Sequence, residues 1–576
     1  MHIKEWINTL GRKTKPVSLN PSPQTEDQKA ATLSHSDRGS EAPTPVIAPE
    51  MKKKGLLDRI IGRKKRPLIK YDFVRHGPLV EALVPEWYEI LEQYWIETGR
   101  SLIIIALNRK TNQKEYLLYE PVLSDFEYEL LERIHEDLRD ILILSTDELD
   151  MDKQNILLDK VYTLLDDYGL VLDDKTLFKL QYYLIRNYIG WSRIDPLMRD
   201  PNLEDISCDG TAIPLFLYHR KYRNIRTNIS FETDVLNSLA ITLAQRSGKH
   251  ISTGSPMLDA TLPDGSRLQL TLGTEVTTRG TSFTIRKFRE DPFSPIELLD
   301  IGTFNADSLA YFWLAIENNK SLIFVGGTAS GKTTSLNAVS MFIPPAAKVV
   351  SIEDTREITL YHENWIASVT RPALTEGGTA INMFDLLRAA MRQRPEFILV
   401  GEVRGEEAQT LFQAMNTGHT TFSTMHAGSV DAAIHRLESE PLNVPRNMIQ
   451  ALNIISVQAL VFHGTERVRR VQEIVEIAGI DPSTGNLRVN NVFTYDPIHD
   501  HFMYTGRSQI YSEIAERRGW SRDQLETEIR VRREVLEAMQ KQGIYDYISV
   551  ASLFHLFNID RQKIIENLPD LRKVFR

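Results

Sequence analysis

The stretch SLIFVGGTASGKTTSLNAVS, residues 321–340, combines an apolar run, a glycine-rich turn and a segment that can be helical. Leu322 to Val325 are all apolar, which indicates a short buried parallel strand. The residues from Gly326 to Thr333 match the phosphate-loop spacing G-x-x-x-x-G-K-[ST] without a gap. We therefore expect a strand, a phosphate loop and a helix, in this order.

The residue types of this loop suit a nucleotide such as ATP. Glycines let successive backbone N–H groups point at phosphate oxygens, and the helix N-terminus adds a positive dipole. Lys332 would place a point charge at the β and γ phosphates, and the Thr333 hydroxyl would ligate Mg²⁺. The expected binding residues are Gly326, Gly327, Thr328, Ala329, Ser330, Gly331, Lys332, Thr333 and Thr334.

Length and composition narrow the class of protein. A chain of 576 residues is too long for one core and suggests about three or four units. Its 42% hydrophobic and 25% charged residues are typical of a soluble globular protein, and a net charge of -9 gives no overall attraction to nucleic acid. One cysteine, Cys208, excludes an intrachain disulfide and a four-cysteine zinc site. With no secretory signal and no apolar run of about 18 residues, we expect a cytoplasmic protein.

The first 66 residues differ from the rest. Residues 13–50 are rich in Pro, Ser, Thr, Glu and Gln, which predicts a disordered tail. Residues 51–66, MKKKGLLDRIIGRKKR, place basic side chains around Leu56, Leu57, Ile60 and Ile61. This stretch is equally consistent with contact to anionic lipid and with a solvated linker helix. A nucleic-acid patch is the weaker interpretation, because interleaved aromatic residues are missing.

Globular patterns begin near Pro67. SLIIIALN and KEYLLYEP predict a hairpin around Asn108–Gln113, and helical periodicity follows over 126–144, 156–168 and 177–189. Further on, a helix is expected near 235–246, and the segments around Arg267 and Arg286 have strand patterns.

The nucleotide-binding core is expected to be an α/β fold. Its apolar strands LIFV, KVVSI, FILV, TTFST and VQALVF alternate with helical segments, which predicts a parallel sheet. Such sheets bind ligands at the carboxyl ends of their strands. RRVQEIVEI and LRVNNVFTY then predict an antiparallel hairpin, and Ser521 with Gln524 predicts a capping box that opens a helix to about Gln540.

Two acidic motifs follow strands of this core. KVVSI leads into Glu353, and FILV leads into Gly401 and Glu402. Carboxylates in these places can hold the water shell of a metal ion and deprotonate an attacking water. His419 and His426 bracket the strand TTFST, where a histidine could sense the γ-phosphate. Their seven-residue separation is not a recognised metal-ligand spacing.

Four ordered motifs resemble the type II/type IV secretion ATPase superfamily. GGTASGKTT, VVSIEDTREI, RQRPEFILVGEVRGEEA and TGHTTFSTMHAGS look like its Walker A, Asp box, Walker B and His box. DISCDG, DGSRLQLTL and SFTIRKF look like its archaeal branch, which serves secretion, type IV pili and the archaellum. Bacterial type II secretion members carry a four-cysteine zinc module, which a chain with one cysteine lacks. The resemblance covers roughly residues 190–510.

This resemblance implies an ATP- and Mg²⁺-dependent ATPase with a RecA-like core, assembled as a homo-hexameric ring. It makes Glu353 the water-activating base, and it makes Glu402 a support for the metal and the water. His426 would be the phosphate sensor, and Arg267 and Arg286 would stabilise transition-state charge. The implied partners are a polytopic membrane platform protein and, indirectly, pilin-like or secreted subunits.

Together with the patterns above, this gives five expected parts, namely a disordered tail at 1–66, an α+β docking domain at 67–190, a second α+β domain at 191–290, a RecA-like domain at 291–510 and a helical extension at 511–576. We expect a motor for a type IV pilus-like filament or for secretion, peripheral to the cytoplasmic membrane. An archaellum motor and a conjugation-type ATPase are alternatives. A nucleic-acid translocase and a nucleotide-gated scaffold are more distant ones.

Overall fold

The structure of the chain is a computed structural model that describes residues 69–141, 153–288, 292–371, 379–464 and 466–575. The tail and the basic stretch 51–66 therefore lie outside the described residues. The chain forms two compact units, one extending to Leu239 together with Thr277–Ser282 and one comprising Ala240–Val276 and Phe283–Arg576. Among the described residues, no helix has both the length and the apolar character needed to cross a membrane.

The first unit is an α+β structure. Strands β1, β2, β3, β6, β5 and β4 lie side by side in that order, and β2 pairs with β3 as the predicted hairpin, with Leu102 opposite Tyr119. The three predicted helices are present as α3, α4 and α5, and they bury mainly leucines in one shared core. The elements are α2 (Phe73–His76), β1 (Tyr88–Glu97), β2 (Ser101–Asn108), β3 (Gln113–Tyr119), α3 (Asp125–Ile141), α4 (Lys153–Asp167), α5 (Asp174–Tyr188), η3 (Ser192–Ile194), α6 (Asp195–Arg199), β4 (Leu203–Cys208), β5 (Phe216–His219), β6 (Arg223–Thr227) and α7 (Thr233–Arg246), whose last residues belong to the second unit.

The second unit is built on a sheet with the order β12-β11-β13-β14-β10-β15-β16-β17-β18. Its first six strands are parallel and its last three are antiparallel, so the predicted α/β core and the predicted hairpin are both confirmed. The strands of this sheet are β10 (Leu322–Gly326), β11 (Val349–Glu353), β12 (Trp365–Val369), β13 (Phe397–Val400), β14 (Thr420–Met425), β15 (Ile454–His463), β16 (Glu466–Ile480), β17 (Leu487–Asp496) and β18 (His501–Tyr504). Strands β7 (Met257–Thr261), β8 (Arg267–Thr271) and β9 (Ser282–Arg286) lie outside this sheet.

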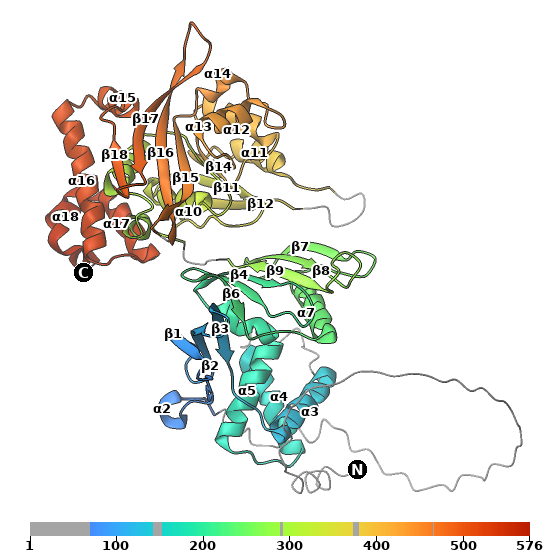
Figure 1. Cartoon of the computed structure of the whole chain (residues 1–576). Helices are drawn as coiled ribbons and strands as arrows, with labels where there is room; N and C mark the ends of the chain where they lie inside the picture. Colours follow the sequence, from blue (N-terminus) through green and yellow to red (C-terminus); the bar gives the residue numbers. More distant parts are fainter. Residues whose placement is uncertain (1–68, 142–152, 289–291, 372–378, 465, 576) are drawn as a thin grey trace, which may run out of the picture. The chain divides into compact units, whose positions relative to one another are not determined.

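Helices cover both faces of this sheet (Figure 1), with α11–α14 on one side and α15–α18 on the other. Because side chains alternate along a strand, Leu322 and Phe324 of β10 join one core while Ile323 and Val325 join the other. The helices are α8 (Pro295–Asp300), α9 (Ala306–Glu317), α10 (Lys332–Val339), η4 (Ser340–Phe342), α11 (Met383–Met391), α12 (Glu407–Asn416), α13 (Val430–Glu438), α14 (Arg446–Ile449), α15 (Gln509–Arg518), α16 (Arg522–Lys541), α17 (Tyr547–Ile559), α18 (Arg561–Glu566) and η5 (Leu568–Phe575).

The C-terminal helical extension, α15 to η5, is part of one of these cores. Trp313 of α9 is fully buried, stacks on Phe342 with ring centroids 5.3 Å apart, and contacts Phe554 and Phe557 of α17 at 4.7 Å each. Ser521 forms the predicted capping box with Gln524 at the start of α16. The extension is therefore packed against the α/β core of the second unit.

Candidate nucleotide site

The phosphate loop lies at the carboxyl end of β10. Gly331, with φ of 93°, and Ala329, with φ of 60°, adopt the left-handed conformation that curls the backbone. A Cβ at Gly326 would lie 2.3 Å from the backbone oxygen of Gln458 on β15, so glycine is required there. The Lys332 ammonium donates to the backbone oxygens of Gly326 (3.1 Å) and Gly327 (2.9 Å). Burial lowers the pKa of Lys332, and the nearby Glu402 carboxylate opposes this effect.

Glu353 ends strand β11, and only 2% of its surface is exposed. Its Oε1 accepts the backbone N–H groups of Glu357 (2.8 Å) and Ile358 (2.9 Å), while its buried Oε2 has no hydrogen-bond partner. Burial is the main cause that raises the pKa of this carboxyl to about 8. A carboxyl group with a pKa near neutrality and a free oxygen is suited to exchange a proton with water.

Glu402 follows β13 and lies near the phosphate loop, since its charge acts on Lys332. Arg404 donates to Glu402 over 2.5 Å and lies 3.9 Å from the Asp354 carboxylate. The hydrogen bond with Glu402 raises the pKa of Arg404. Arg404 stands in the motif GEVRGEEA, where an arginine two residues after a glutamate carries no specific sequence signal.

Arg267 on β8 and Arg286 at the end of β9 both face Glu357. The Arg267 guanidinium lies 3.0 Å from the Glu357 carboxylate, and that of Arg286 lies 3.8 Å from it. Arg267 also donates to the backbone oxygen of Thr355 at 3.5 Å. The structure therefore brings both arginines to the segment that follows Glu353.

The two histidines lie at opposite ends of β14. His419 precedes the strand, and its Nδ1 is 3.3 Å from the Thr417 hydroxyl. His426 follows the strand, and its backbone oxygen accepts a hydrogen bond from Arg436. A six-residue strand spans about 20 Å, so these rings cannot share a metal ion. Within the described ranges, no group of three or more His, Cys, Asp and Glu side chains is arranged to hold a metal ion.

Two residues near the phosphate loop had no sequence signal. Arg469 on β16 donates from Nε to the backbone oxygen of Ala329 at 3.0 Å. Asn337 of α10 donates to the backbone oxygen of Glu357 and accepts from the Thr359 N–H, each at 3.2 Å. The segment after Glu353 is therefore hydrogen-bonded to α10, the helix that follows the phosphate loop.

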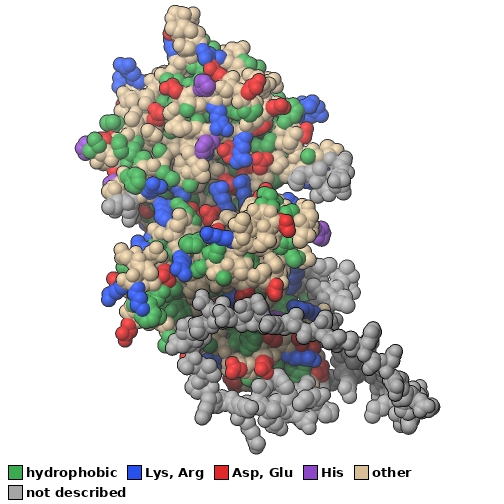
Figure 2. All heavy atoms as spheres, turned by 45° about the vertical axis from the view of Figure 1, so that its right-hand side comes forward, with side chains coloured by type: hydrophobic (Ala, Val, Ile, Leu, Met, Phe, Trp, Pro, Cys, Tyr) green, Lys and Arg blue, Asp and Glu red, His purple; other side chains and the backbone are tan. Residues whose placement is uncertain are grey.

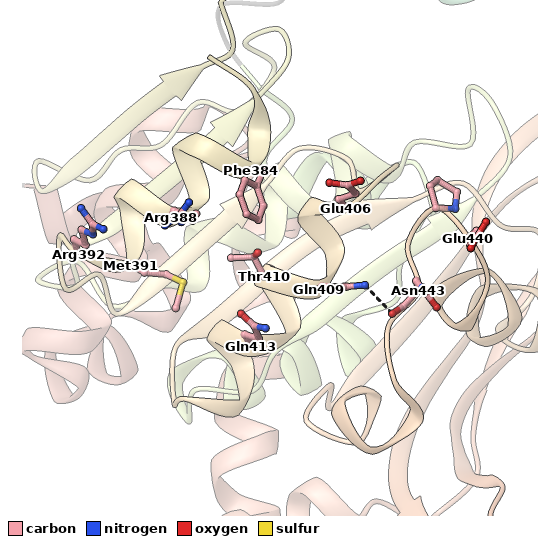
Figure 3. A pocket seen from close by; sticks show the side chains of 11 residues that line it. Phe384, Arg388, Met391, Arg392, Glu406, Gln409, Thr410, Gln413, Glu440 and Asn443 are labelled. Carbon is pink, nitrogen blue, oxygen red and sulfur yellow. Dashed lines mark hydrogen bonds between the residues drawn. The ribbon is translucent and has the colours of Figure 1, made fainter. Parts of the chain in front are cut away.

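A large cavity of 860 Å³ lies elsewhere in the second unit (Figure 3). It is formed by α11, α12 and the turn at 440–443, where Gln409 donates to the backbone oxygen of Asn443 at 3.0 Å. Its lining residues are Phe384, Arg388, Met391, Arg392, Glu406, Gln409, Thr410, Gln413, Glu440, Pro441 and Asn443. None of them belongs to the expected nucleotide site.

Comparisons with known proteins show which family the chain is similar to. The family model described as "Type II/IV secretion system protein" matches residues 217–576. An uncharacterized protein of Methanocaldococcus jannaschii is 39% identical over 68% of this chain and 71% of its own length. The type IV secretion system protein PtlH of Bordetella pertussis is 36% identical over 40% of this chain and 73% of its own length.

Among solved structures, the pilus retraction motor PilT with bound ADP covers 61% of this chain and 93% of its own, at 17% identity and a TM-score of 0.34. The VirB11 ATPase of Brucella suis covers 48% and 90%, at 22% identity and a TM-score of 0.25. The family match covers more than half of the chain, including the phosphate loop and both acidic motifs. The chain belongs to the type II/IV secretion system protein family.

Proposed function

We propose that this protein is a Mg²⁺-dependent ATPase that drives assembly of a type IV pilus-like filament, or protein secretion, at the membrane. The observation that carries this proposal is the common edge of the sheet in the second unit. The phosphate loop, Glu402 and Glu353 follow the carboxyl ends of the parallel strands β10, β13 and β11. Parallel strands place their carboxyl ends at one edge of a sheet, which is where ligands bind.

The residues at this edge have complementary roles in hydrolysis of ATP. Lys332 and the loop N–H groups bind the β and γ phosphates. The ionised form of Glu353 accepts a proton from the attacking water while the bond between the γ-phosphorus and the ADP oxygen breaks. Arg267 and Arg286 stabilise the charge that develops on the phosphoryl group, and His426 senses the γ-phosphate.

Thr333 and Glu402 fit the proposed Mg²⁺ site. Both offer oxygen donors, and Glu402 lies close enough to the loop to act on the pKa of Lys332. Thr333 stands in the first turn of α10, beside the expected phosphates. Bound Mg²⁺ would neutralise charge on the β and γ phosphates.

The proposed assembly is a homo-hexamer on the cytoplasmic side of the membrane, working with a polytopic platform protein. PilT and PtlH, by their names, serve a pilus and a type IV secretion system. The similarity to PtlH supports a conjugation-type secretion ATPase as the second candidate, with the archaellum motor as a further alternative. Nucleic acid is not an expected partner. Basic and acidic side chains are interspersed on the face that Figure 2 shows.

Phosphate release by purified protein tests the proposal. We expect Mg²⁺-dependent release of phosphate from ATP by the wild type. Lys332→Ala should lose nucleotide binding, while Glu353→Gln should bind ATP and hydrolyse it at least 100-fold more slowly. Near-normal turnover by Glu353→Gln would move the base to Glu402, and no turnover by the wild type in any oligomeric or lipid-bound form would refute the function.

A further inference from the structure

Residues Glu357 to Thr359, at the end of the Asp box, are held by side chains from three other places in the second unit. Glu353 accepts the N–H groups of Glu357 and Ile358. Asn337 binds the carbonyl of Glu357 and the N–H of Thr359. Tyr547 donates its hydroxyl to the carbonyl of Thr359 at 2.9 Å. We call these contacts the loop clamp.

Asn337 and Tyr547, the two members of the loop clamp outside the Asp box, are well placed to fix the backbone of Glu357 to Thr359. Asn337 is 5% exposed and stands on α10, one and a half turns after Lys332. Tyr547 is 8% exposed and stands at the start of α17. Burial raises the pKa of the Tyr547 hydroxyl, so it remains a hydrogen-bond donor at neutral pH. The clamp therefore joins the phosphate-loop helix to the C-terminal helices.

Helix α17, which carries Tyr547, is held in place by packing against the core. Phe554 and Phe557 of this helix pack on the buried Trp313. Next to Tyr547, a cavity of 390 Å³ is lined by Leu360, His362 and His555 among others. Ile358, within the clamped segment, is fully buried in the core of this unit, so packing and the hydrogen bonds of the clamp together hold the segment.

We propose that Asn337 and Tyr547 are positioning residues for Glu353, through which the C-terminal helices control the hydrolysis step. When the clamp is intact, the N–H groups of Glu357 and Ile358 orient the Glu353 carboxyl and leave Oε2 free for water. When Tyr547 releases Thr359, these N–H groups are no longer fixed and the carboxyl is misplaced. This inference rests on the proposed ATPase function.

The test replaces Tyr547 by Phe, which removes one hydroxyl and keeps the ring. Tyr545→Phe is the matched control, because Tyr545 lies two residues away and its hydroxyl binds Asp300 and Gln540 instead of the clamp. Two readouts apply to the full chain, namely hydrogen–deuterium exchange of the segment 354–363 without nucleotide and steady-state release of phosphate.

We expect Tyr547→Phe to raise amide exchange at Glu357 and Ile358 several-fold and to lower kcat about five-fold, the equivalent of one hydrogen bond. KM should stay at the wild-type value, and the melting temperature should fall by no more than about 2 °C. In a Glu353→Gln background, the same change should have no further effect on kcat, because the carboxylate it positions is gone. The Tyr545→Phe control should leave both readouts unchanged.

Three results would overturn the inference. Unchanged exchange in Tyr547→Phe would show that the hydroxyl does not hold the segment. Raised exchange with unchanged kcat would show that the segment does not position the base. An equal loss of kcat in the wild-type and Glu353→Gln backgrounds would assign Tyr547 a general structural role. A wild type that releases no phosphate refutes the proposed function, while the exchange measurement still decides whether the clamp exists.

Discussion

The buried carboxyl of Glu353 predicts an unusual pH dependence of stability. Its pKa rises from 4.5 to about 8 in the folded protein, mainly because of burial. Above pH 4.5 the unfolded chain therefore loses this proton while the folded protein keeps it. The stability that Glu353 contributes is full below pH 4.5 and is lost progressively as the pH rises through about 8. Glu353→Gln removes this titration, so the variant should gain stability over the wild type as the pH rises.

The size of the gain follows from the shift. One pH unit corresponds to about 1.4 kcal/mol, so the difference in unfolding free energy should grow by about 3 kcal/mol between pH 5.5 and 7.5. For a unit of roughly 330 residues, an unfolding entropy of about 2 cal/mol/K per residue converts this into about 4 °C. The new amide also buries N–H groups where Oε2 has no partner. The cost of burying these N–H groups is independent of pH. The change of the stability difference with pH, and not its absolute size, is therefore the diagnostic quantity.

The assay is thermal unfolding of the nucleotide-free protein, followed by tryptophan fluorescence at half-unit steps from pH 5.5 to 8.5. Glu516→Gln, on the exposed face of α15, is the control and should follow the wild-type slope. The melting temperature of Glu353→Gln minus that of the wild type should increase up to about pH 8 and then level off. A difference that stays constant over this range would refute the argument from burial.

Three further perturbations test separate parts of the structure. Gly401→Ala places a Cβ 3.1 Å from Cγ of Glu353, so we expect kcat to fall about ten-fold, and unchanged turnover would contradict the tight contact between β11 and β13. Trp313→Ala empties the fully buried site against Phe342, Phe554 and Phe557 and should cost about 3–5 kcal/mol, measured by denaturant unfolding. Deleting residues 1–66 should preserve ATPase activity and weaken flotation with anionic liposomes, and unchanged flotation would remove lipid contact as a role for residues 51–66.

Much of the fold could be predicted because its signals are local. The parallel strands are short apolar runs, the phosphate loop is a contiguous motif, and the capping box of Ser521 and Gln524 spans four residues. Strand β12 was missed, since it is short and only partly buried. Helix α17 was not delimited, because apolar residues lie on most of its circumference and give little helical periodicity.

Parts of the candidate site depend on contacts that no local pattern reports. Glu353 and Glu402 could be predicted because each follows an apolar strand. Tyr547 and Thr359 are 188 residues apart, and neither has a sequence context that marks it. The sequence around Asn337 predicts only a helix, and its hydrogen bonds to Glu357 and Thr359 are visible only in the tertiary structure. Sequence thus points to the proposed reacting groups, while the groups that hold them emerge only from tertiary structure.

Opposing effects of its surroundings set the pKa of Glu353. Burial and the nearby Glu357 carboxylate raise the pKa of Glu353, whereas the two N–H donors and the Arg267 charge lower it. Burial dominates, so at pH 7 most Glu353 carboxyl groups are protonated and only the ionised fraction can accept a proton from water. Arg267 now pairs with Glu357. Any rearrangement that weakens burial or brings positive charge closer to Glu353 would ionise it and create the base. The segment 357–359 contacts Glu353 and is fixed by Asn337 and Tyr547. Through this segment, both substrate binding and the C-terminal helices can therefore change the protonation of Glu353.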